Sequence, residues 1–88
     1  MGQVAVLFRL MPKEVGTDLK EVAKGVRAAL PADVTVRGMQ VKDIAFGLQS
    51  LLVAVVMNDT GGVLESTERA LEKVPHVESV EVMEEGLL

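Results

Sequence analysis

The longest apolar stretch of this chain, residues 48–57, limits the folds that are open to it. It lies between Gly47 and the polar pair Asn58 and Asp59, and it is rich in leucine and valine. An apolar run of this length between turn residues is typical of a strand buried on both faces. We therefore predict a central strand with two largely apolar faces, both of which we expect to be covered or used in binding. One face would carry Leu51, Val53, Val55 and Met57, and the other Ser50, Leu52, Ala54 and Val56.

The residues before this strand have the pattern of a strand followed by a helix. Residues 3–11 predict a first strand that ends at Pro12, with Val4, Val6, Phe8 and Leu10 on one face and Ala5, Leu7 and Arg9 on the other. Apolar residues then repeat at a spacing of three and four, which predicts an amphipathic helix that Thr17 caps and Pro31 ends. The apolar stripe of this helix consists of Leu19, Val22, Ala23, Val26 and Leu30.

Three more elements complete the predicted secondary structure. Residues 33–41 alternate but change parity at Gly38, which indicates a strand with a bulge. After a loop at residues 58–62, helical spacing returns until Pro75 and His76 end it; the stripe is Leu64, Thr67, Leu71 and Val74. Residues 77–83 alternate again and predict a last strand, followed by a short tail at residues 84–88.

The order strand, helix, strand, strand, helix, strand predicts one α+β domain over residues 1–88. Because both helices have a single apolar stripe, we expect them to cover one face of a four-stranded antiparallel sheet, as in the ferredoxin-like plait. We further expect the first and third strands to lie parallel in the centre of the sheet. That arrangement would bring Met1, Phe46 and Leu88 together at one end of the molecule.

Composition excludes several kinds of function. The chain has 9 basic and 13 acidic residues, so its formal charge of -4 repels a phosphate backbone, and we expect no useful affinity for nucleic acid at physiological salt. It contains no cysteine, which removes disulfides and thiolate metal sites. No apolar run approaches the roughly 18 residues that a membrane span needs, and the N-terminus has no signal-peptide pattern. We expect a cytoplasmic protein without cofactor or metal.

The best candidate for a functional site is the segment Ile44, Ala45, Phe46 and Gly47, which comes directly before the central strand. A phenylalanine at the start of a strand is usually part of the core. Beside Gly47, however, a turn without a side chain leaves room for another molecule to approach Phe46. Sequence alone leaves both interpretations open. A second possible contact surface is the helix-free face of the sheet, with self-association as the alternative; its apolar residues are Leu7, Leu52, Ala54 and Val56.

Other chemical sites have weaker signals. Gly61 and Gly62 precede a helix and could hold an anion, but the spacing and the lysine of a P-loop are missing. His76 is the only histidine, and it has no cysteine or obvious serine partner for catalysis. The carboxylates of Asp59, Glu84 and Glu85 are better explained as solvated surface groups. We therefore do not expect an enzyme.

At residues 44–48, the sequence Ile-Ala-Phe-Gly-Leu resembles a motif of the archaeal elongation factor 1-beta family, the nucleotide-exchange factors of translation. The resemblance extends over the whole chain. It includes the strand end at Met11 and Pro12, the helix end at residues 29–31, the turn at Gly61 and Gly62, and the closing segment of residues 77–82.

The resemblance implies the plait fold and a role in exchanging GDP for GTP on elongation factor 1-alpha. In eukaryotic relatives, the phenylalanine of the motif contacts this GTPase, and Phe46 matches it. A lysine close to the C-terminus of those relatives reaches toward the magnesium ion of the GTPase, but Leu87 stands at that position here. We expect the tail to lie beside Phe46, where Leu87 and Leu88 would add apolar contacts to the GTPase or pack against Phe46.

Other functions known for this fold find less support. An acylphosphatase-like enzyme needs a phosphate-binding loop with arginine and asparagine after the first strand, whereas residues 12–16 read Pro-Lys-Glu-Val-Gly. An RNA-binding sheet needs exposed aromatic residues and basic charge. A ferredoxin-like small-molecule-binding or regulatory interaction domain remains an alternative, because its sequence signals are weak.

Overall fold

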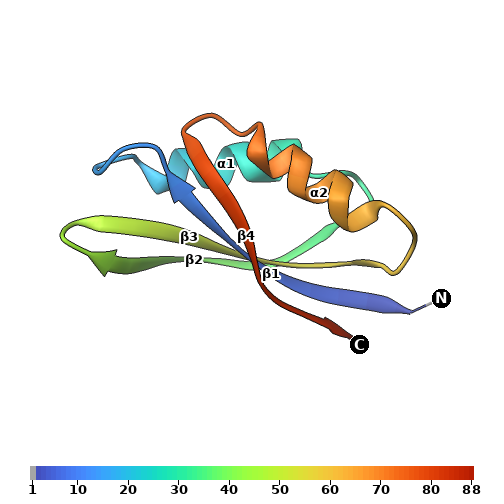
Figure 1. The fold of residues 1–88 in the computed structure, drawn as a ribbon. Helices are drawn as coiled ribbons and strands as arrows, with labels where there is room; N and C mark the ends of the chain where they lie inside the picture. Colours follow the sequence, from blue (N-terminus) through green and yellow to red (C-terminus); the bar gives the residue numbers. More distant parts are fainter. Residues whose placement is uncertain (1) are drawn as a thin grey trace.

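The computed structural model describes residues 2–88 as one sheet with two helices (Figure 1). The elements follow the predicted order βαββαβ. Their bounds are β1 Gln3–Pro12, α1 Leu19–Ala29, β2 Thr35–Ala45, β3 Leu48–Asn58, α2 Val63–Glu72 and β4 Val77–Leu87. The predicted central strand is β3, and it differs from the prediction by one residue at its end.

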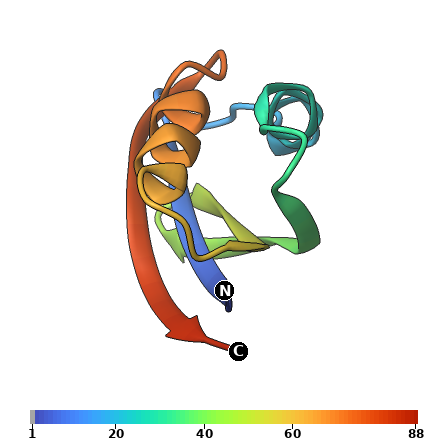
Figure 2. The ribbon, with the colours of Figure 1, turned by 90° about the vertical axis from the view of Figure 1, so that its right-hand side faces the viewer.

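The four strands lie in the order β2-β3-β1-β4, and both helices lie on one face of the sheet (Figure 2). This arrangement confirms the ferredoxin-like plait. All three strand pairs are antiparallel, including β1 with β3. Our expectation that the first and third strands run parallel is therefore wrong. Each helix connects two strands of the same direction, and a strand of opposite direction is inserted between them, so the two central strands oppose each other.

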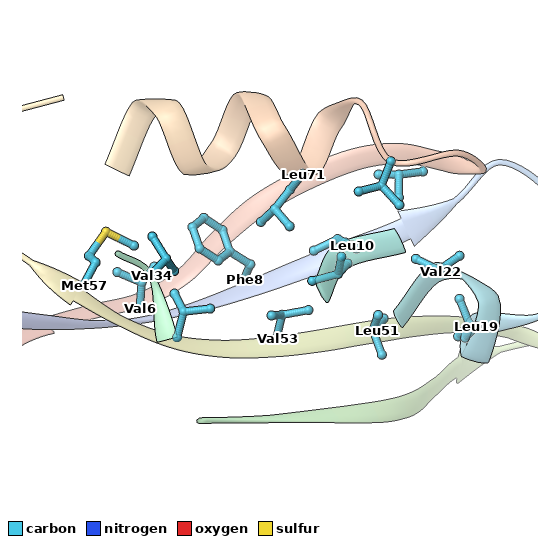
Figure 3. Packing of buried hydrophobic residues seen from close by; sticks show 14 of the residues in the cluster. Val6, Phe8, Leu10, Leu19, Val22, Val34, Leu51, Val53, Met57 and Leu71 are labelled. Carbon is cyan, nitrogen blue, oxygen red and sulfur yellow. The ribbon is translucent and has the colours of Figure 1, made fainter. Parts of the chain in front are cut away.

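The core lies between the helices and one face of the sheet (Figure 3). Alternate residues of the two central strands supply most of it, because successive side chains of a strand point to opposite faces. Val22 and Val26 of α1 and Leu71 of α2 close it from the other side. The strand residues of this layer are Val4, Val6, Phe8, Leu10, Leu51, Val53, Val55 and Met57, all of them buried as predicted for β3.

The start of α1 differs from the prediction by one residue. Asp18, not Thr17, is the N-cap, and its Oδ1 accepts a hydrogen bond from the backbone N–H of Lys20 at 2.9 Å. The Thr17 hydroxyl instead donates to the carbonyl of Glu14 at 2.7 Å, within the preceding turn. Both residue types are good caps, so the sequence pattern alone does not distinguish two neighbours. The predicted end before Pro31 is confirmed.

Two edge strands depart from regular pairing. In β2 the register shifts between Val36 and Gly38, which confirms the predicted bulge. In β4 the register shifts where Met83 lies, opposite Leu7 and Phe8, and the strand then continues to Leu87. Residues 84–87 are therefore part of the sheet and pair with the first half of β1. The prediction of a separate tail is wrong, because the bulge resets the alternation on which the strand end was judged.

The β2–β3 turn lies at one end of the molecule, and the start of β1 and the end of β4 lie at the other (Figure 1). The molecule measures 42 × 20 × 17 Å. Leu87 pairs with Val4, which pairs with Met57, and Met57 is nine positions along β3 from Leu48. At about 3.3 Å per residue, the two ends are about 30 Å apart. The expected proximity of Phe46 and Leu88 is therefore wrong; Met1, the third residue of that prediction, lies outside the described residues.

Candidate functional site

Phe46 and Gly47 form a two-residue turn that joins β2 to β3. Ala45 and Leu48 are the last paired residues of the two strands, and the φ angles of Phe46 and Gly47 are +51° and +81°. Positive φ at both positions is the signature of the type I′ turn, whose twist matches that of the flanking strands. Such turns strongly prefer Asn-Gly. A phenylalanine at the first position is thus an exception to the rule that normally selects this residue.

The Phe46 side chain is fully exposed to solvent. A bulky residue in the left-handed region costs about 1–2 kcal/mol relative to glycine, and Phe46 recovers none of this through burial. The alternative that Phe46 belongs to the core is therefore wrong. Residues held in unfavourable backbone conformations cluster at sites of function, where the side chain they present has a use. This geometry makes Phe46 the strongest candidate for contact with another molecule.

The rest of the predicted motif surrounds Phe46 at this end of the hairpin. Ile44 is 44% exposed, and Ala45 and Gly47 are also exposed. Close to the turn, where Asp43 pairs with Gln49, the side-chain amide of Gln49 donates a hydrogen bond to Oδ1 of Asp43 at 2.7 Å and links the two strands. The structure therefore brings Ile44, Ala45, Phe46 and Gly47 together as one exposed tip.

Val15, which sequence reasoning did not select, lies next to this tip. It belongs to the loop between β1 and α1, and it is 65% exposed. A Cβ atom placed on Gly47 would lie 3.7 Å from Cγ1 of Val15, so the two turns are close neighbours. The available signal was an apolar residue inside the otherwise polar turn of residues 13–18.

Leu87 and Leu88, the other predicted contact residues, lie at the opposite end. Both are largely exposed, and the backbone N–H of Leu88 donates to the carbonyl of Gln3 at 2.9 Å. They border an open groove of about 750 Å³ on the helix-free face. Its apolar lining includes Ala5, Leu7, Ala54 and Val56. Three residues of the predicted helix-free surface, Leu7, Ala54 and Val56, thus line the same groove as Leu87 and Leu88, although Val56 itself is buried.

An ion pair crosses the middle of the helix-free face. One guanidinium nitrogen of Arg9 lies 2.9 Å from both carboxylate oxygens of Glu81, its neighbour across the β1–β4 pair. The pair is partly exposed, so it adds little stability. It does interrupt the apolar surface between the groove and the tip, which makes this face a mixed rather than a continuous apolar surface.

Two of the weaker candidates lie in the turns on either side of α2. Gly62 begins α2 with a φ of +83°, which explains the glycine by backbone geometry. His76 is exposed in the turn before β4, where its carbonyl accepts a hydrogen bond from the N–H of Lys13. Within residues 2–88, no group of three His, Asp or Glu residues is arranged to hold a metal ion.

A membrane span would require longer and more apolar helices than those of the described residues. Neither α1 nor α2 has the length and apolar character to cross a membrane.

Comparison with known proteins agrees with the resemblance and the fold. Residues 5–87 match the family model described as the EF-1 guanine nucleotide exchange domain. The chain is 41% identical to elongation factor 1-beta of Methanosarcina acetivorans, with 96% of each chain covered. It is 40% identical to that of Methanococcoides burtonii (98% of this chain, 97% of the relative) and 39% identical to that of Halorubrum lacusprofundi over the full length of both.

Among solved structures, the C-terminal domain of the MgtC protein from Mycobacterium tuberculosis superposes with a TM-score of 0.58 at 17% identity, covering 99% of this chain and 88% of that one. At this identity, the likeness concerns the fold alone. The sequence match, by contrast, extends over almost every element described above, including the exposed turn. This chain therefore belongs to the family of EF-1 guanine nucleotide exchange domains.

Proposed function

We propose that this protein promotes the exchange of GDP for GTP on elongation factor 1-alpha by binding and stabilising the nucleotide-free form of that GTPase. The family description and the names of the relatives support an exchange role in translation elongation. A factor that binds the nucleotide-free form more tightly than the nucleotide-bound form weakens nucleotide affinity by the same ratio, because the two binding equilibria are linked. Such a factor makes and breaks no covalent bond. It would act in the cytoplasm, where elongation takes place.

The observation that carries this proposal is the exposed Phe46 in a left-handed turn position. Large aromatic side chains at the centre of an interface supply much of its binding free energy. The tight turn holds Phe46 at the end of the β2–β3 hairpin. The ring therefore projects beyond the sheet and can enter a pocket on the GTPase. Ile44, Ala45 and Gly47 would contact the rim of that pocket.

Leu87 and Leu88 would form a second contact at the far end of the sheet. They are about 30 Å from the turn by strand length, so they cannot pack against Phe46 and must meet a different part of the partner. Glu84 and Glu85 lie beside them. Two carboxylates would attract a magnesium ion rather than displace it. In this proposal, Leu87 and Leu88 at the end of β4 add apolar contact, and the turn with Phe46 acts on the nucleotide site of the GTPase.

The test is the release of a fluorescent GDP analogue from elongation factor 1-alpha in the presence of wild-type protein and of Phe46→Ala. Truncating an interface anchor costs about 2 kcal/mol or more, so we expect exchange to fall about 30-fold. Val41→Ala, a change at an exposed valine of β2, is the matched control for loss of apolar surface away from the turn.

Circular dichroism and thermal unfolding would establish that both variants fold. If Phe46→Ala and Val41→Ala accelerate GDP release from elongation factor 1-alpha equally, Phe46 is not the residue that anchors this protein to the GTPase. A pull-down with wild-type protein tests the regulatory-domain alternative. That alternative is favoured if the protein leaves GDP release unchanged and the pull-down recovers a ligand-dependent dimer instead of a GTPase.

A further inference from the structure

The loop that contains Val15 is closed by hydrogen bonds into a tight turn. The N–H of Thr17 donates to the carbonyl of Glu14 at 3.3 Å, and the Thr17 hydroxyl donates to the same oxygen at 2.7 Å. Gly16 has a φ of +89°. A positive φ at the third position of a hydrogen-bonded four-residue turn is characteristic of type II, and it leaves Val15 at the second position with its side chain outward.

Both ends of this loop are also attached to the body of the molecule. The N–H of Lys13 donates to the carbonyl of His76 at 2.9 Å, which joins the start of the loop to the turn before β4. At the other end, Asp18 caps α1 through the N–H of Lys20. Val15 is therefore presented in a defined position. A surface that is already ordered loses little conformational entropy when a partner binds.

Two tight turns thus meet at one end of the protein, and each presents an apolar side chain at its apex. Val15 is 65% exposed and Phe46 fully so, and Cγ1 of Val15 lies 3.7 Å from the position that a Cβ atom on Gly47 would occupy. Ile44 flanks the turn from the helix-free side, where it lines a hollow with Leu7 and Leu52. Val15 approaches from the loop that leads into the helical layer. The turn is bordered by apolar surface on both sides.

Resting on the proposed function, we propose that Val15 is a second anchor residue, which contacts the same GTPase surface as Phe46. The occupant is an apolar surface of elongation factor 1-alpha, because it would be continuous with the pocket that receives the Phe46 ring. A pocket that encloses the end of a hairpin necessarily meets what lies against the turn. On the helical side, that neighbour is Val15. Because the Val15 side chain is largely exposed, it contributes little buried apolar surface to the fold. Its burial against a partner would stabilise the complex.

The experiment compares Val15→Thr with Val82→Thr in the GDP-release assay with full-length protein. Each change exchanges one methyl group for a hydroxyl on an exposed β-branched residue. Val82 lies on β4 at the level of Phe8 and Val53, five residues along β3 from the start of that strand. That level is about 17 Å from the turn. Val15→Ile, which keeps the apolar surface, tests rescue.

We expect Val15→Thr to lower exchange about 4-fold and to weaken binding to the nucleotide-free GTPase by the same factor, because one buried methyl group is lost from the contact. Val82→Thr and Val15→Ile should exchange like wild type, and the unfolding temperature of Val15→Thr should equal that of wild type. Equal exchange by Val15→Thr and Val82→Thr, with Phe46→Ala still impaired, would overturn this inference and leave the proposed function standing. A lower unfolding temperature in step with lower exchange would also overturn it, because Val15 would then act through the fold. Wild-type protein without exchange activity would refute the proposed function itself.

Discussion

Replacing Phe46 by asparagine should make the protein more stable and less active. The turn requires positive φ at residues 46 and 47, and asparagine adopts the left-handed region with less strain than phenylalanine. Phe46 is fully exposed, so its removal forfeits no buried surface. Relief of part of the 1–2 kcal/mol left-handed penalty should raise the free energy of unfolding by about 1 kcal/mol. For a domain of this size, that gain corresponds to an increase in Tm of about 4–8 °C.

Differential scanning calorimetry of wild type and Phe46→Asn measures the change, with GDP release measured on the same samples. The expected combination, a higher Tm with exchange reduced as in Phe46→Ala, is the signature of a residue retained for function at the expense of stability. A lower Tm would refute the reasoning, because it would show that the ring makes stabilising contacts. A higher Tm with unchanged exchange would show that Phe46 is strained but makes no contact with the GTPase.

Two further predictions follow from the packing and from the length of the molecule. Gly25→Ala should lower Tm although alanine is the better helix former, because the new Cβ would lie 2.8 Å from Cγ1 of Val74; thermal unfolding decides this, and a higher Tm would show that Val74 moves aside. Leu87→Ser combined with Phe46→Ala should weaken binding to nucleotide-free elongation factor 1-alpha by the sum of the two separate free-energy losses, because distant sites are independent; calorimetric titration measures this, and a strongly non-additive result would mean that the two ends act as one site.

The architecture was predictable because periodicity depends on local sequence. The alternation in β1 and the stripes of α1 and α2 reflect which residues face one shared core, and one pattern is enough to identify each element. The parity change at Gly38 located the β2 bulge for the same reason. The bulge in β4 was missed because Val82, Met83 and Glu84 have no glycine or proline to mark it. Apolar and acidic residues adjoin there, and pairing with Leu7 and Phe8 decides the register.

The candidate site was only partly predictable. Residues 44–47 stood out through an apolar group beside a glycine, but whether Phe46 faces the core or the solvent depends on the exact register of the β2–β3 hairpin. Ala45 pairs with Leu48, which leaves only two residues for the turn and forces Phe46 outward. The proximity of Val15 to Gly47 brings together residues 32 positions apart in the sequence. No local pattern encodes such proximity, because it follows from how β1 and β3 are paired.

The directions of the strands determine where the β2–β3 turn and the C-terminus lie relative to each other. β1 and β2 run one way, and β3 and β4 run the other way. The β2–β3 turn therefore lies where β1 ends, and the C-terminus lies where β1 begins. Any side chain at position 87 acts about 30 Å from the Phe46 ring. If Leu87 stands where the resemblance implies a lysine in eukaryotic relatives, that difference leaves the turn unchanged, so on the proposed function we expect the turn to engage the GTPase without residues 84–88. The proposed function thus assigns contact to two separate surfaces at opposite ends of one sheet, the turn with Phe46 and residues 84–88, and a change in one of them leaves the other in place.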